Sequence, residues 1–236
     1  MSHSFHDPHN SRRDFLNQLA LGATSLGLAS LASPLHLQAA LSQSDFATSS
    51  DENPDAWFKK ITGKHKLIVD VPRPHEIFPF AWPKVFLLTN AATGTPEQDC
   101  SVVVVLRHDA IPYAMESALW AKYKFGEVFK ADDPATKTPS LRNPFWQPKP
   151  DDFTVPGVGP VEIGIDQLQK SGVMFCVCNM AITVYSAAIG ASMELDPAAV
   201  KAEWLAGVLP GIHVVPSGVW AIGRAQEKGC GYCFAG

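Results

Sequence analysis

Two cysteines, Cys176 and Cys178, are the residues of this sequence best suited to chemistry. They lie at the end of a short apolar run, 173–177, which predicts a buried strand, and helical spacing of apolar residues begins directly after them. Asn179 is the predicted N-cap of that helix, since its side chain can accept an amide hydrogen of the first turn. A thiol at a helix start feels the positive end of the helix dipole, which favours the nucleophilic thiolate. Because free cysteine is also among the most buried residue types, each thiol has a second interpretation as part of the core.

A second group of polar residues follows the run 101–106, a continuous series of β-branched and apolar residues. Such a run is typical of a strand buried on both faces of a parallel sheet. Arg107 and His108 come directly after it. The carboxyl ends of parallel strands form the usual ligand-binding edge of an open α/β sheet. His108 is therefore a candidate acid, base, thiolate partner or ligand, and its other interpretation is a surface or capping histidine.

Ser217 and Gly218 occupy the corresponding place near the carboxyl terminus. They follow a short predicted strand, 211–215, and precede a predicted helix, 219–227, that ends at Gly229. Main-chain amides at such a helix start can hold an anion. We therefore expect Ser217 and Gly218 on the same edge of the sheet as Cys178 and His108.

The chain has five cysteines, so at least one thiol is unpaired or capped by an external group. Cys230 and Cys233 have the two-residue spacing of a local disulfide, a redox pair or half of a metal site. A zinc site needs further ligands, and no second cysteine pair with the expected spacing occurs. We expect a structural disulfide or unpaired thiols at Cys230 and Cys233, and no metal.

Composition favours one globular domain that buries a full core. The chain has 236 residues, of which 46% are hydrophobic and 18% charged, and its formal net charge is −4. A slightly acidic chain without basic clusters gives no support to nucleic-acid binding.

The first 39 residues have the pattern of a twin-arginine signal peptide. Ser-Arg-Arg-Asp-Phe-Leu at 11–16 precedes a mildly apolar run, 19–37, and a small-residue cleavage site at 37–39. The alternative is an amphipathic helix that stays on the protein. We expect export of the folded chain to the periplasm, a mature protein of 236 − 39 = 197 residues, and no membrane span after removal of the signal.

The remaining elements follow from apolar spacing and from proline. Residues 40–63 read as a polar linker followed by a short helix at 55–61. A proline-rich insertion at about 126–164 is expected to be a lid, a binding loop or a subunit contact. The other predicted elements are a strand at 65–71 and helices at 80–92 with Pro83 in the first turn, at 113–123, at 163–170 and from Asp196.

The order of these elements, together with two sequence segments, resembles the DsrE/DsrF-like family. The segments are Gly172–Met180 and His213–Tyr232, with support from 101–106, and the resemblance covers about residues 64–236. It implies a flavodoxin-like α/β domain with an open parallel sheet of about five strands and helices on both faces. It also implies assembly into trimers or hexamers, and in some members a persulfide on a cysteine at the position of Cys176 or Cys178.

The leading functional hypothesis is an exported, sulfurtransferase-like sulfur carrier that holds sulfane sulfur on Cys178 or Cys176. No cofactor is expected beyond that cysteine-bound sulfur, and the sulfur donor or acceptor is not indicated by the sequence. The alternative is a non-catalytic oligomeric module that binds a ligand or partner and has structural cysteines. A third hypothesis is thiol–disulfide chemistry at Cys230 and Cys233, although no thioredoxin-like pattern surrounds them.

Overall fold

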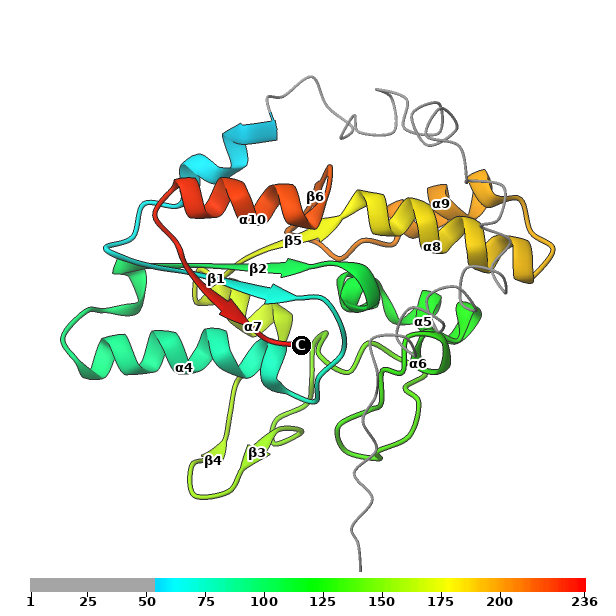
Figure 1. Ribbon diagram of the computed structural model, residues 1–236. Helices are drawn as coiled ribbons and strands as arrows, with labels where there is room; N and C mark the ends of the chain where they lie inside the picture. The colour runs from blue at the N-terminus through cyan, green and yellow to red at the C-terminus, as the bar shows by residue number, and fades with distance from the viewer. Residues whose placement is uncertain (1–53) are drawn as a thin grey trace, which may run out of the picture. The chain divides into compact units, whose positions relative to one another are not determined.

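The computed structural model describes residues 54–236, and the predicted signal peptide (1–39) and nearly all of the linker lie outside this range. Its centre is a five-stranded parallel sheet in the order β6-β5-β2-β1-β7 (Figure 1). The predicted fold class, an α/β fold with an open parallel sheet, is confirmed. The strands are β1 (His65–Val71), β2 (Cys100–Leu106), β5 (Met174–Cys178), β6 (Ile212–Val215) and β7 (Gly231–Phe234).

Helices cover both faces of this sheet (Figure 1). Helices α4 (Phe78–Ala92) and α7 (Ile165–Lys170) pack on one face, and α10 (Gly218–Glu227) with the 3₁₀ helix η2 (Pro54–Lys60) packs on the other. The side chains of β2 show why the sheet is buried on both sides. Val102, Val104 and Leu106 face α4 and α7, whereas Val103 and Val105 face α10. Alternation of side chains along a strand therefore gives the protein two apolar cores.

The register of the sheet aligns the carboxyl ends of its central strands. Leu106 at the end of β2 pairs with Val177, and Cys178 at the end of β5 pairs with Val215. Residues that follow β2 and β6 are consequently brought beside Cys178. Helices α8 (Asn179–Ser192) and α9 (Pro197–Ala206) pack against each other after β5, and Asp196 is the N-cap of α9 as its sequence predicts.

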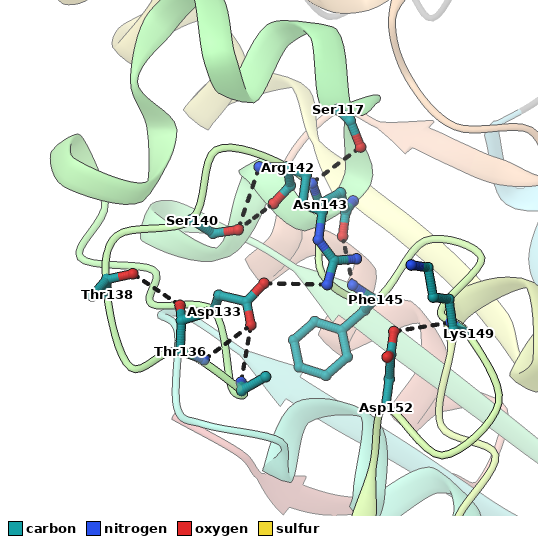
Figure 2. A network of polar contacts seen from close by, with 11 residues as sticks. Ser117, Asp133, Thr136, Thr138, Ser140, Arg142, Asn143, Phe145, Lys149 and Asp152 are labelled. Carbon is teal, nitrogen blue, oxygen red and sulfur yellow. Dashed lines mark hydrogen bonds and ion pairs between the residues drawn. The ribbon is translucent and has the colours of Figure 1, made fainter.

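The insertion at 126–164 is integrated into the fold through a polar network and an aromatic core residue. Figure 2 shows part of this network, in which the Asn143 backbone amide donates to the Ser117 hydroxyl and the Phe145 amide donates to the Asn143 side-chain oxygen. The Asn143 side-chain amide also donates to the carbonyl oxygens of Tyr113 and Met115, each at 2.9 Å. Phe145 is fully buried, and its ring stacks on Phe80 with 4.1 Å between centroids. The segment also contains a small hairpin of β3 (Thr154–Val155) and β4 (Gly159–Pro160). The packing of Phe145 against Phe80 anchors the insertion to the core under α4.

Two predicted elements differ in the structure, and one strand was not predicted. The single helix expected over 113–123 is divided into the 3₁₀ helix η4 (His108–Ala114) and α5 (Ser117–Tyr123), followed by α6 (Phe125–Val128). The break follows from the Asn143 contacts, which take the carbonyls that a continuous helix would use. Helix α4 begins two residues before the predicted start, so Pro83 lies inside it and not in its first turn. Strand β7 was not predicted, because the two cysteines near it obscured a four-residue edge strand.

Among residues 54–236, no helix has both the length and the apolar character needed to cross a membrane.

Candidate functional site

A pocket of about 290 Å³ lies at the carboxyl edge of the sheet, where β2, β5 and β6 end. Its lining includes five of the residues singled out from the sequence, which are Arg107, His108, Cys178, Ser217 and Gly218. This is the usual position of a ligand site in an open α/β sheet. The sequence-based expectation that these residues share one edge is confirmed.

Cys178 supplies the thiol of this pocket. Its side chain is 6% exposed and lies at the point where β5 ends and the chain turns into α8. The structure corrects the predicted cap, because Cys178 and not Asn179 is the N-cap residue of α8. Its Sγ accepts a hydrogen bond from the amide of Ala181 at 3.3 Å. The sulfur therefore has an amide donor and lies at the positive end of the helix dipole.

Asn179 and Cys176 lie away from the pocket surface. Asn179 is buried as the first residue of α8 and does not belong to the pocket lining. Cys176 is fully buried in the core between β2 and α10, among Val103, Val105 and other apolar side chains. This burial, together with the charge of Cys178, raises the pKa of the Cys176 thiol far above its ordinary value. The structure therefore separates the two central cysteines into one at a pocket and one in the core.

Arg107 is held at the pocket by a buried carboxylate. Its Nε and Nη2 donate to the two carboxylate oxygens of Asp70 at 2.7 and 2.9 Å, and the Tyr232 hydroxyl donates to the same carboxylate at 2.7 Å. The hydrogen bond to Asp70 is the main reason that the pKa of Arg107 is raised. The guanidinium also interacts electrostatically with Cys178. Because Asp70 is 1% exposed, Arg107 is paired with a buried carboxylate that uses two of its five N–H donors.

The side chain of Arg107 packs directly against Gly218. A Cβ atom at this position would lie 2.6 Å from the Arg107 Cβ and 3.0 Å from its Cδ, so no side chain fits without a shift. The neighbouring Ser217 is the N-cap of α10, and its Oγ accepts a hydrogen bond from the Trp220 amide at 3.2 Å. The starts of α8 and α10 thus meet at one pocket, with Arg107 packed against the second.

His108 has a corresponding carboxylate of its own. Its Nδ1 lies 3.1 Å from the Asp109 Oδ1, and its Nε2 lies 3.4 Å from the hydroxyl of Tyr185, which also donates to Asp109. The hydrogen bond to Asp109 raises the pKa of His108 above its ordinary value, and this outweighs the opposing effects of partial burial and of Arg107. Burial alone would raise the pKa of Asp109, but the hydrogen bonds from His108 and Tyr185 lower it. His108 is 63% exposed at the pocket mouth and adopts a left-handed backbone (φ 50°).

The carboxyl-terminal cysteines form no bond and lie away from the pocket. Cys230 and Cys233 are free thiols; Cys230 packs into the core below α10, and Cys233 packs against the core on the opposite face of the sheet. The disulfide considered from their spacing is therefore absent. Cys230 directly precedes β7 and Cys233 lies within it, and the alternation of side chains along the extended chain places the two thiols on opposite faces of the sheet. Among residues 54–236, no group of three or more histidine, cysteine or acidic side chains is arranged to hold a metal ion.

Sequence reasoning missed the residues that support the two cations. Asp70 carried a usable signal, since it is a carboxylate within the apolar strand 65–71. Asp109 adjoins His108, and Tyr185 lies two helical turns after Cys178 on the same face of α8. Tyr232 gave no signal, because β7 itself was not predicted. The apolar pocket wall, formed by Met180, Ala181, Val184 and Val219, was also not anticipated.

Comparison with known proteins adds little to this geometry. No family model matches the chain, and a search of the curated proteins found no match. Among solved structures, the chain is similar to a protein of unknown function from Methanobacterium thermoautotrophicum. The likeness has 14% sequence identity and a TM-score of 0.38, and it covers 72% of this chain and 99% of the other. Statements about function therefore come from the residues of this chain.

Proposed function

We propose that this protein is a DsrE-like sulfur carrier that accepts sulfane sulfur on Cys178 and passes it on. The observation that carries the proposal is the position of the Cys178 Sγ, which caps α8 and lines an open pocket together with Arg107 and His108. Sulfur transfer needs a stabilised thiolate, an approach for the donor and nearby groups that stabilise the leaving group. This pocket offers an amide donor and a helix start at the sulfur, an approach for the donor and two basic side chains. The buried Cys176 offers none of them, so the proposal now rests on Cys178 alone.

The transfer step requires no external oxidant or reductant. The Cys178 thiolate attacks the outer sulfur of a donor persulfide, R–S–SH, and a new S–S bond forms between Cys178 and that sulfur. The S–S bond between the two sulfurs of the donor breaks, and its electron pair leaves on the inner sulfur as R–S⁻, while the proton stays on the transferred sulfur. An acceptor thiolate that attacks the outer sulfur of the resulting persulfide reverses these roles and regenerates the Cys178 thiolate.

Export and assembly form part of the same proposal. The Arg12-Arg13 pattern supports periplasmic delivery in the folded state. A stripe of exposed apolar side chains on α4, formed by Trp82, Val85 and Leu88, supports homo-oligomerisation. Replacement of both arginines by lysine should retain the protein in the cytoplasm, as cell fractionation can detect. Light scattering of the purified protein should give a mass of several subunits, and a monomer would count against the oligomer.

The test of the carrier is a mass measurement on the purified full-length protein after treatment with polysulfide. We expect one added sulfur atom on the tryptic peptide 171–201, which contains both central cysteines and no internal lysine or arginine. The adduct should disappear in Cys178→Ser and persist in Cys176→Ser. Serine is a suitable replacement at 178, because its hydroxyl can still accept the Ala181 amide and cap α8. If the adduct disappeared in Cys176→Ser and persisted in Cys178→Ser, the assignment of the sulfur to Cys178 would be contradicted.

The alternative function is a non-catalytic binding module whose cysteines are structural. The observation in its favour is the burial of Cys178 together with the apolar wall of Met180, Val184 and Val219. This alternative predicts that polysulfide leaves peptide 171–201 unmodified and that alkylating agents leave both central thiols intact in the native protein. Either result, obtained with a protein shown to be folded, would favour the binding module over the sulfur carrier.

A further inference from the structure

Two basic side chains and the starts of two helices border the pocket. Arg107 and His108 line the pocket, whereas their carboxylate partners, Asp70 and Asp109, do not. No acidic side chain of residues 54–236 belongs to the lining. Each ion pair therefore acts as an oriented dipole with its cation toward the cavity and its anion behind. The starts of α8 and α10 add two helix dipoles with the same orientation.

This orientation is fixed by hydrogen bonds from other parts of the chain. Asp70 in β1 holds Arg107 through two bonds, and Tyr232 in β7 holds Asp70 through a third. Tyr185 in α8 donates to Asp109 and adjoins His108. Arg107 consequently cannot leave Asp70 without breaking two hydrogen bonds, and His108 is held at the exposed pocket mouth by Asp109 and Tyr185. A preorganised positive surface beside a thiolate would attract an anion that the thiolate alone would repel.

The rest of the pocket lining is mainly apolar. Met180, Val184 and Val219 supply apolar surface, and the last two are exposed at the mouth. Since Cys178 is recessed below this mouth, the pocket suits a small molecule that can enter. The combination of a cationic wall, an apolar wall and a sulfur nucleophile defines the ligand.

We propose that the pocket selects a small sulfane-sulfur donor with an anionic sulfonyl group, namely thiosulfate or an organic thiosulfonate, whose leaving group binds Arg107 and His108. This inference rests on the proposed carrier function. The Cys178 thiolate attacks the outer sulfur of the donor and forms an S–S bond with it. The bond between that sulfur and the sulfonyl sulfur breaks, and its electron pair leaves as sulfite or an organic sulfinate. Sulfur is transferred without any further reagent, and the negative charge of the leaving group develops at the cationic wall.

The first experiment measures the charge preference of Cys178 directly and does not depend on sulfur transfer. Anionic sulfonatoethyl and cationic trimethylammonioethyl methanethiosulfonate are reacted with the full-length protein at constant ionic strength, and their rates at Cys178 are compared. Arg107→Gln should lower the anionic-to-cationic rate ratio about tenfold, as expected for removing one unit charge a few ångströms from the reacting sulfur. Arg107→Lys should retain most of the ratio. Arg142→Gln, which removes an arginine paired with Asp133 in the insertion, should leave it unchanged.

The second experiment identifies the donor. Wild-type protein treated with thiosulfate or with benzenethiosulfonate should gain one sulfur atom on Cys178 and release an equal amount of sulfite or benzenesulfinate. If benzenethiosulfonate reacts faster than thiosulfate, the preferred donor is the organic thiosulfonate, whose ring contacts the apolar residues of the pocket. If it reacts at an equal or lower rate, the preferred donor is thiosulfate. Sulfate, an unreactive anion, should slow modification of Cys178 by neutral methyl methanethiosulfonate in the wild-type protein, which tests the anion site without any variant.

The outcomes separate this inference from the function on which it rests. If polysulfide loads Cys178 but neither sulfonyl donor does, the carrier stands and the donor class is overturned. The inference is also overturned if the anionic-to-cationic rate ratio is unchanged in Arg107→Gln. If that single variant is unstable, the double variant Arg107→Gln with Asp70→Asn, which keeps the net charge, serves for the same test. If no donor of any kind loads Cys178, the carrier function itself falls.

Discussion

Two glycines of the same helix, Gly218 and Gly223, should respond in opposite ways to replacement by alanine. Gly223 lies within α10, and a Cβ atom there would meet no atom within 4 Å apart from its chain neighbours and the nearby backbone of its own helix. Alanine is favoured over glycine in a helix interior by about 0.8–1.0 kcal/mol, so Gly223→Ala should stabilise the protein by about 1 kcal/mol. Gly218 begins the helix, and its added Cβ would lie 2.6 Å from the Arg107 Cβ. Overpacking of this kind costs about 1–3 kcal/mol.

The net effect of Gly218→Ala is therefore a destabilisation of about 1–2 kcal/mol, after a smaller helix-propensity gain at the first helical position. The two variants should then differ by about 2–3 kcal/mol in the free energy of unfolding. With a urea slope of about 2–3 kcal/mol per molar for a domain of this size, their urea midpoints should be separated by about 1 M. Urea unfolding followed by circular dichroism measures this separation, and equal slopes in the two variants would show that the comparison is valid.

The same pair also reports on the site. Gly218→Ala must displace Arg107 or the start of α10, so the preference of Cys178 for the anionic methanethiosulfonate should fall in that variant. Gly223→Ala should keep the wild-type preference. If Gly218→Ala proved as stable as Gly223→Ala and retained the preference, Arg107 would not be packed against α10, and the account of the cationic wall would be refuted.

Three other predictions follow from the described contacts. Asn143→Ala should destabilise the protein by about 2–4 kcal/mol in urea unfolding, because two carbonyls and one amide of the buried backbone lose their partner; a change below about 0.5 kcal/mol would contradict the anchoring role of the insertion. Asp109→Asn should lower the pKa of His108, as NMR titration of the imidazole can measure. Since the folded-state pKa of His108 is raised, its stabilising contribution is fully present below its ordinary value of 6.5 and is lost as pH rises through the raised value. Since the pKa of Asp109 is lowered, its stabilising contribution is lost as pH falls through that lowered pKa. The difference in unfolding free energy between wild type and Asp109→Asn should therefore be largest at pH values between the lowered pKa of Asp109 and the raised pKa of His108. Iodoacetamide should label Cys178 and leave Cys176 intact in the native protein, because Cys176 is fully buried with a raised pKa; equal labelling would mean that the core around it opens readily.

Several elements could be predicted from local pattern because local physics decides them. Strand β1 has the predicted bounds, and the β-branched run ending at Leu106 indicated a strand buried on both faces. Asp196 before Pro197 marked the start of α9 through its side-chain cap. The elements that failed depend on distant residues. The break between η4 and α5 is made by Asn143, about 30 residues further along the chain, and β7 exists because β1 offers it a pairing edge.

The candidate site shows the same division. The sequence by itself determined that Cys178, His108 and Ser217 each follow a strand, and parallel strands place their carboxyl ends at one edge. It could not determine which central cysteine faces the pocket, because that depends on where α10 covers the sheet and where β5 ends.

Only the tertiary structure decided how the cations point. Asp70 and Tyr232 come from strands on the far side of Arg107, and Tyr185 reaches Asp109 from the second turn of α8. The order of residues in a chain fixes which charges exist, whereas the direction of each charge depends on partners that folding brings together from distant segments. The positive surface beside Cys178 is therefore a property of the assembled sheet and its helices.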